Sequence, residues 1–85
     1  MYSILFAKSA DKTLRRMPRD VAQPIRQKLD SIAADPYADH PDVTRLQNRL
    51  GFRLGVRDWR VIYEIEGERL IVLVLNIGLR REVYR

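Results

Sequence analysis

The sequence predicts an α+β fold in a single domain, residues 1–85, with a short N-terminal strand, a two-helix hairpin and then a three-stranded antiparallel meander packed on the helices. Three observations support this prediction. The chain has 85 residues, which is enough for one small core. Apolar residues recur with a helical period up to about position 35. From position 52 onward they alternate with a period of two or form β-branched runs.

The first 18 residues predict a strand followed by a helix. Residues 2–6 form a short apolar run, and we expect this strand to join the edge of the sheet. Ser9 can cap a helix that runs to about Arg16, and Pro18 breaks it. The apolar face of this helix comprises Ala10, Leu14 and Met17.

A second helix is predicted directly after this proline. Asp20, followed three residues later by Gln23, resembles a capping box. Pro24 then lies about one turn into the helix, where it costs little if Asp20 is the cap. The step Asp35–Pro36 ends the helix. Its apolar stripe comprises Val21, Ile25, Leu29 and Ile32.

Residues 36–48 predict a loop rich in Asp and Pro, with a turn of helix near Thr44–Asn48. The period then changes to two, because apolar side chains at 52, 54 and 56 alternate with Arg53, Gly55 and Arg57. This pattern predicts a strand with one apolar face and one face that is cationic apart from the glycine.

Two further strands complete the predicted meander. Asp58 marks a turn, residues 59–66 form the next strand, and Gly67–Glu68 makes a hairpin turn. Residues 69–77 are apolar on both faces, so we expect a central strand covered by helices on at least one side. Gly78 is expected to let the chain bend. In such a meander Arg53, Arg57, Arg60 and Arg80 can converge in one region of the sheet.

The positive charge is concentrated in two short segments. Of 16 Lys and Arg against 11 Asp and Glu, residues 49–60 hold a net +3 and residues 76–85 a net +2, all of it from arginine. Arginine presents a planar fork of donors that matches phosphate oxygens. The pattern is the expected footprint of a nucleic-acid partner, and on charge alone a solvated basic surface explains it equally well. The expected RNA contacts are Arg49, Arg53, Arg57 and Arg81.

Several function classes are excluded by what the sequence lacks. There is no cysteine, so disulfides, thiolate metal sites and cysteine nucleophiles are ruled out, and a cytoplasmic location is expected. The longest apolar run, residues 70–75, is too short to span a bilayer, and there is no signal-peptide pattern. His40 is the single histidine, and the acidic residues near it match no metal-ligand spacing. No phosphate-binding glycine loop or serine elbow occurs, so no metal and no cofactor is expected.

Arginines with nearby tyrosines therefore carry the remaining chemistry. Arginine cannot exchange a proton near neutrality, but it can bind a phosphate and stabilise negative charge that develops on it. Tyrosine can donate a proton, or accept one if neighbouring cations lower its pKa. This set suits attack of an RNA 2′-OH on its own neighbouring phosphate, which needs no metal. A passive phosphate-binding surface would use the same residues.

The second half of the chain resembles a known toxin family. The stretch FRLGVRDWRVIYEI, the Gly-Glu turn and the stretch IVLVLNIGLRREVY are similar to the RelE branch of the RelE/ParE toxin superfamily. SADKTLRRMP near the N-terminus also fits, so the resemblance covers nearly the whole chain. It implies the toxin of a type II toxin–antitoxin pair that enters the ribosome and cleaves mRNA without a metal. The implied partners are the ribosome, mRNA and an acidic, RelB-like antitoxin, with no membrane.

The resemblance also implies roles for individual residues. Arg53 matches a basic site residue, while Arg60 and Arg80 would hold the scissile phosphate and stabilise its charge. Tyr84 would stack on a base or take part in proton transfer. Gly55 departs from the family pattern, because active relatives often place a second Lys or Arg there. Arg57, two residues further on, could compensate for the missing cation.

Two alternatives to the ribosome-dependent nuclease remain. One is a ParE-like toxin that inhibits DNA gyrase by binding it. The other is a catalytically weak family member that mainly binds its antitoxin, which the glycine at position 55 keeps open. The Arg…Glu-Val-Tyr ending favours the nuclease, because the ParE branch generally lacks that ending.

Overall fold

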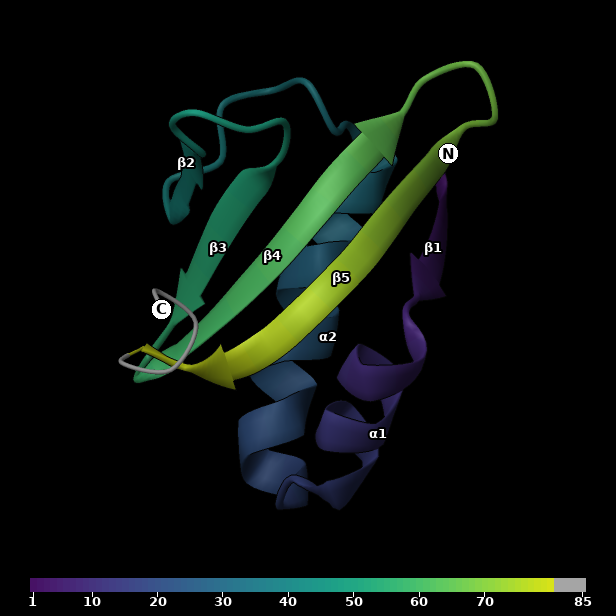
Figure 1. Ribbon diagram of the computed structural model, residues 1–85. Helices are drawn as coiled ribbons and strands as arrows, with labels where there is room; N and C mark the ends of the chain where they lie inside the picture. Colours follow the sequence, from purple (N-terminus) through teal and green to yellow (C-terminus); the bar gives the residue numbers. More distant parts are fainter. Residues whose placement is uncertain (81–85) are drawn as a thin grey trace.

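The computed structural model of the chain describes residues 1–80. A five-stranded sheet in the order β1-β5-β4-β3-β2 carries two helices on one of its faces (Figure 1). β1 runs parallel to β5, and the other neighbouring strands are antiparallel. The predicted α+β class is confirmed. In chain order the elements are β1 (Ser3–Phe6), α1 (Lys8–Arg16), α2 (Arg19–Ala34), β2 (Val43–Arg45), β3 (Phe52–Val56), β4 (Trp59–Glu66) and β5 (Ile71–Leu79).

The first helix begins earlier than its sequence predicts. Ala7, not Ser9, occupies the N-cap position of α1, and no side chain caps it. A single residue separates β1 from α1, and the Ala7 amide donates to the Val74 carbonyl of β5 at 2.8 Å. This backbone bond ties the start of α1 to the sheet, so the position of the helix is set by tertiary structure rather than by the serine.

The capping box predicted for the second helix is also wrong. Pro18 is the N-cap of α2, and its carbonyl accepts hydrogen bonds from the amides of Val21 and Ala22, each at 3.0 Å. Asp20 instead lies in the first turn, where a carboxylate is favourable near the positive end of the helix dipole. Pro24 consequently lies inside the helix, where the proline removes one backbone hydrogen bond.

The segment predicted as a loop with a helical turn contains the edge strand β2. Val43, Thr44 and Arg45 pair with Leu54, Arg53 and Phe52 of β3. The Leu46 amide then donates to the Gly51 carbonyl at 3.0 Å, which closes the connection to β3. The prediction of a helical turn at Thr44–Asn48 is wrong, because the free edge of β3 offers hydrogen-bonding partners that a helical turn would leave unused.

The last strand lies two residues further along the chain than the predicted 69–77, because the β4–β5 turn takes up residues 67–70 instead of Gly67–Glu68 alone. β5 extends from Ile71 to Leu79, so Gly78 continues the strand and pairs with Arg60 instead of bending the chain. β5 lies between β1 and β4, which confirms its expected interior position. Its pairing with β4 is irregular at one point, between Ile62 and Tyr63.

The helices cover only one face of the sheet, which we call the inner face (Figure 1). Its core is built from Leu14 of α1, Ile25 and Leu29 of α2, and alternate residues of the strands such as Val61 and Val74. Tyr63 is fully buried in this core and stacks on Phe52 with ring centroids 5.4 Å apart. Burial raises the pKa of Tyr63 to about 12. The opposite, outer face has no helix on it within residues 1–80.

Candidate functional site

The arginines of β3 and β4 meet on the outer face of the sheet. Leu54 and Val56 point into the core, so the alternating residues Arg53 and Gly55 point the other way. A shallow hollow of about 340 Å³ opens there. We call it the arginine pocket; it is lined by Pro41, Asp42, Thr44, Arg53, Gly55, Arg57 and Arg60.

Arg60 is a half-buried cation of this pocket. It pairs with Gly55 across the two strands, and its guanidinium Nη1 donates to the Trp59 carbonyl at 3.3 Å. Its Nε is buried, and within residues 1–80 it has no hydrogen-bond partner. A desolvated guanidinium attracts an anion more strongly than one in bulk water, because the local dielectric constant is lower.

Arg57 enters the pocket from the turn between β3 and β4. Val56 pairs with Trp59, so the turn consists of Arg57 and Asp58 alone. Arg57 has a φ of 55°, in the left-handed region, while Asp58 does not. Positive φ at the first residue of a two-residue hairpin is the type II′ arrangement, in which glycine usually takes that position. An exposed arginine there is held at a cost in backbone energy.

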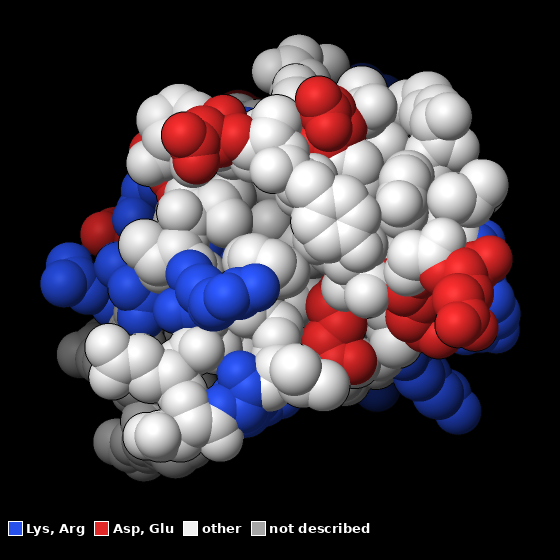
Figure 2. Space-filling model, turned by 90° about the horizontal axis from the view of Figure 1, so that it is seen from above, with Lys and Arg blue, Asp and Glu red and all other residues white. Residues whose placement is uncertain are grey.

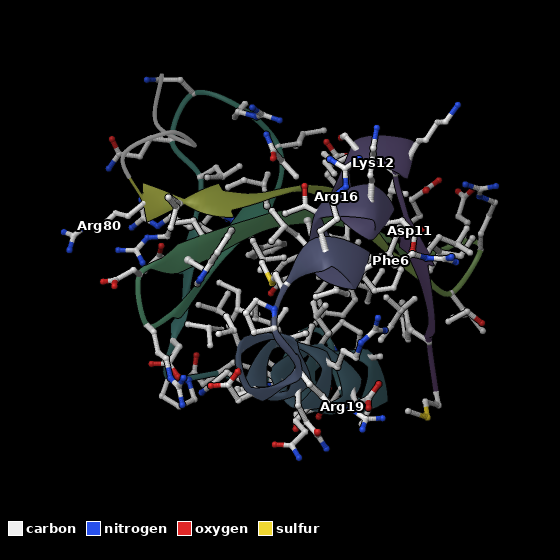
Figure 3. All side chains as sticks on the ribbon, turned by 90° about the horizontal axis from the view of Figure 1, so that it is seen from below. Phe6, Asp11, Lys12, Arg16, Arg19 and Arg80 are labelled. Carbon is white, nitrogen blue, oxygen red and sulfur yellow. The ribbon has the colours of Figure 1, made fainter. Side chains whose placement is uncertain are left out.

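Arg80 lies beside the same turn. Its amide donates to the Asp58 carbonyl at 2.8 Å, directly after the pairing of Leu79 with Trp59. Its exposed side chain lies at the end of the sheet, well away from Arg19 on α2 (Figure 3). Of the four arginines expected to converge, Arg53, Arg57 and Arg60 line the pocket, whereas Arg80 is held beside the turn by its backbone and is not among the lining residues.

Among the described residues, Asp42 is the one acidic side chain that lines the pocket. Its carboxylate forms an ion pair with Lys28 of α2. Because this partner balances the carboxylate, the arginines keep their excess positive charge toward an incoming anion.

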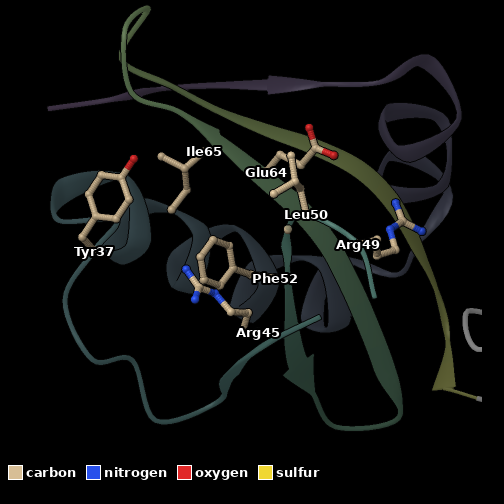
Figure 4. A pocket seen from close by; sticks show the side chains of 8 residues that line it. Tyr37, Arg45, Arg49, Leu50, Phe52, Glu64 and Ile65 are labelled. Atoms are coloured by element: carbon tan, nitrogen blue, oxygen red, sulfur yellow. The ribbon is translucent and has the colours of Figure 1, made fainter. Parts of the chain in front are cut away.

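Arg49 lies elsewhere. It lines a second hollow, of about 430 Å³, next to the start of β3 (Figure 4). There the Arg45 guanidinium carbon stands 5.8 Å from the centroid of the Phe52 ring. The two hollows share no lining residue, so the structure does not bring Arg49 together with Arg60. On the end of the molecule seen in Figure 2, the largest group of Lys and Arg lies on the left, and further basic side chains lie beside acidic ones at the right edge.

Two predicted site residues, Arg81 and Tyr84, lie outside the described residues. Two residues that border the arginine pocket, Asp42 and Thr44, were not predicted from the sequence. They were assigned to a loop or a helical turn. The β-branched pair Val43–Thr44 was the available sign of a strand.

The arginine pocket offers phosphate-binding chemistry. No group of three or more metal-ligating side chains occurs within residues 1–80. Guanidinium groups can bind two phosphate oxygens at once and stabilise added negative charge, but they do not transfer protons near neutral pH. None of the helices in this part of the chain is long and apolar enough to cross a bilayer.

Solved structures share this fold. A chain of the intact Escherichia coli RelBE toxin–antitoxin complex superposes with a TM-score of 0.81 and 21% identity, covering 93% of this chain and 96% of that one. A chain of the archaeal RelE–RelB complex from Pyrococcus horikoshii superposes with a TM-score of 0.79 and 22% identity, covering 93% of this chain and 94% of that one. A YoeB/ParE toxin from Agrobacterium tumefaciens superposes with a TM-score of 0.78 and 12% identity, covering 91% of this chain and 96% of that one. At these identities the likeness establishes the fold alone.

The family is established by sequence. No curated protein matches the chain significantly. Residues 4–84 do match the family described as the ParE toxin of the type II toxin–antitoxin system parDE, and this match spans almost the entire chain. The RelE-like fold agrees with it. The chain therefore belongs to the ParE toxin family of type II toxin–antitoxin systems, within the RelE/ParE superfamily.

Proposed function

We propose that this toxin cleaves messenger RNA on the ribosome, by attack of an RNA 2′-OH on the adjacent phosphate. The observation that carries the proposal is the arginine pocket, in which the half-buried Arg60 lies with Arg53 and Arg57 on an open sheet face. A cluster of this kind fits the phosphate of a single strand laid across the sheet. The substrate supplies its own nucleophile, so the reaction requires neither a cofactor nor a metal.

The proposed step forms a bond between the 2′-oxygen and phosphorus and breaks the bond from phosphorus to the 5′-oxygen. The products are a 2′,3′-cyclic phosphate and a 5′-hydroxyl end. Arg60 and Arg80 neutralise the charge that accumulates on the phosphoryl oxygens, which is the effect expected of preorganised cations at a transition state. Tyr84 is the candidate for proton transfer or base stacking; the described arginines cannot move the proton themselves.

We also propose an acidic antitoxin as the protein partner. The chain carries a net charge of +5, which favours a partner of opposite charge. Similar folds occur in the Escherichia coli RelBE complex and the Pyrococcus horikoshii RelE–RelB complex, which supports a partner of that kind.

Inhibition of DNA gyrase is the second candidate, because the matched family is that of the ParE toxins. The two candidates differ in which nucleic acid is damaged. Expression of the toxin without its antitoxin, followed by mapping of mRNA ends and of DNA breaks, separates them. Cuts in phase with codons support the nuclease, whereas double-strand DNA breaks with intact mRNA contradict it.

The role of the arginines is tested in the same assay. Arg60→Ala and Arg80→Ala should each lower the cleavage rate by about 10²-fold or more, the scale for losing one preorganised charge stabiliser. Arg19→Ala is the matched control, because it removes the same charge from the exposed start of α2, away from Arg80 (Figure 3). Full activity of Arg60→Ala at normal expression would remove the arginine pocket from the mechanism.

A further inference from the structure

Gly55 lies directly beneath the Arg60 guanidinium. A Cβ atom built on Gly55 would stand 3.1 Å from Arg60 Nη1 and 3.6 Å from Arg60 Cζ. The first distance is closer than ordinary van der Waals contact. The guanidinium thus occupies, on the outer face of the sheet, the place where a side chain of residue 55 would begin.

Backbone conformation does not explain a glycine at this position. Gly55 has no positive φ, so any residue could adopt its backbone geometry. A glycine inside a strand is normally unfavourable, because it loses more conformational freedom on folding and has no side chain to pack. The neighbouring backbone is not crowded either, since the Asp42 carbonyl oxygen would be 4.0 Å from the added carbon. The side chain of Arg60 is the group that needs the space.

The hydrogen bonds of Arg60 do not account for its position. The one bond formed by its side chain in the described structure is the 3.3 Å contact from Nη1 to the Trp59 carbonyl, which is long. Its buried Nε has no partner there. Packing across Gly55 is therefore the contact that determines where the guanidinium lies.

We infer that Gly55 is a positioning residue: by lacking a side chain, it lets the Arg60 guanidinium lie flat across β3 and enter the arginine pocket beside Arg53 and Arg57. Gly55 has no cationic side chain of its own, and the guanidinium of its paired residue, Arg60, lies over it instead. The expected effect of Gly55 on cleavage rests on the proposed function. The packing of the Arg60 guanidinium over Gly55 does not depend on that function.

The primary test is Gly55→Ala. The new methyl group meets the far end of a flexible side chain, so the guanidinium should move while the fold persists, and the melting temperature should stay the same or rise. The cleavage rate should fall by about 10- to 100-fold, because a misplacement near 1 Å costs up to about 10²-fold. Gly67→Ala is the matched control: it adds the same methyl group at the β4–β5 turn, where the nearest atom is the Tyr37 hydroxyl at 3.2 Å. This control should cleave at the wild-type rate.

A double-mutant cycle shows whether the effect passes through Arg60. In the Arg60→Ala background the contact is absent, so Gly55→Ala should cause no further loss of cleavage. If Gly55→Ala alone destabilises the fold, the same cycle applies to stability, and the defect should vanish in that background. Additive losses in both cleavage and stability would overturn the inference.

A measurement on the free protein makes the inference independent of the reaction. The Nε–H signal of Arg60 in an NMR spectrum should exchange slowly with solvent in the wild type and in Gly67→Ala, because Nε is buried. Gly55→Ala should shift this signal and speed its exchange by tenfold or more. An unchanged signal refutes the positioning role. A changed signal in a protein that cleaves no RNA supports the positioning role and refutes the proposed function.

Discussion

Arg57→Gly should stabilise the protein although it removes a side chain from the candidate site. Arg57 occupies the first position of a two-residue turn with a φ of 55°. Glycine reaches this region without the steric conflict between Cβ and the following carbonyl that every other residue meets. The substitution also removes one of the arginines that repel each other around the pocket.

The expected gain follows from two opposing terms. A left-handed conformation costs a non-glycine residue about 1–2 kcal/mol. Glycine also lowers the folding stability by about 0.4–1 kcal/mol, because it gives the unfolded chain more conformational freedom. A net stabilisation of roughly 0.5–1 kcal/mol remains, equivalent to a rise in melting temperature of about 2–8 °C for a domain of this size.

Arg57→Ala is the control that separates the effect of backbone strain on stability from the effect of charge repulsion. It removes the same cation and keeps the unfavourable φ, so it should gain only the relief of charge repulsion, which high salt screens. Both variants are compared by thermal and urea unfolding at low and high salt. Arg57→Gly should be more stable than Arg57→Ala by a margin that salt does not change. Equal stability of the two variants would refute the argument from backbone strain.

Three further outcomes are expected. Tyr63→Phe should stabilise the fold by about 1 kcal/mol, because the hydroxyl is buried without a partner within residues 1–80, and urea unfolding measures this gain. With a folded pKa of about 12 against 10 unfolded, Tyr63 makes the wild type lose stability as pH rises from 10 to 12, and the variant should lack this component. Tyr84→Phe should slow single-turnover cleavage on programmed ribosomes if the hydroxyl transfers a proton, whereas only Tyr84→Ala should do so if the ring stacks on a base. The antitoxin should raise the melting temperature of the toxin with increasing concentration; no shift at saturating antitoxin would contradict the pairing.

The parts of the fold that follow from local pattern were predictable from sequence. The alternation placed Arg53 on the strand face opposite Leu54, as the structure has it, and Arg57 lines the same pocket although it lies in the turn after β3. The β4–β5 pairing follows from two β-rich runs separated by a short turn. Each of these features depends on residues within a few positions of one another, where periodicity is informative.

The parts that failed depend on partners distant in sequence. β2 forms because β3 presents a free edge, and its three residues are too few to reveal a strand by alternation, although two of them are β-branched. The start of α1 is set by a bond from Ala7 to β5, more than sixty positions away. Gly55 could be noted as unusual, but its relation to Arg60 requires the register of the hairpin, which pattern alone does not supply.

Three costly local features coincide in the hairpin between Gly55 and Arg60: a glycine within a strand, an arginine with left-handed φ and a buried Nε without a partner in the described structure. Strain by itself does not mark a site, because Leu70 has the same φ of 55° in the β4–β5 turn and lines none of the hollows described above. The β3–β4 hairpin differs because its strained and unsatisfied groups are cations directed at one open pocket. An 85-residue domain has little stability to spare. Costs concentrated in six residues are what the proposed phosphate-binding role predicts, because strained and unsatisfied groups persist where function requires them.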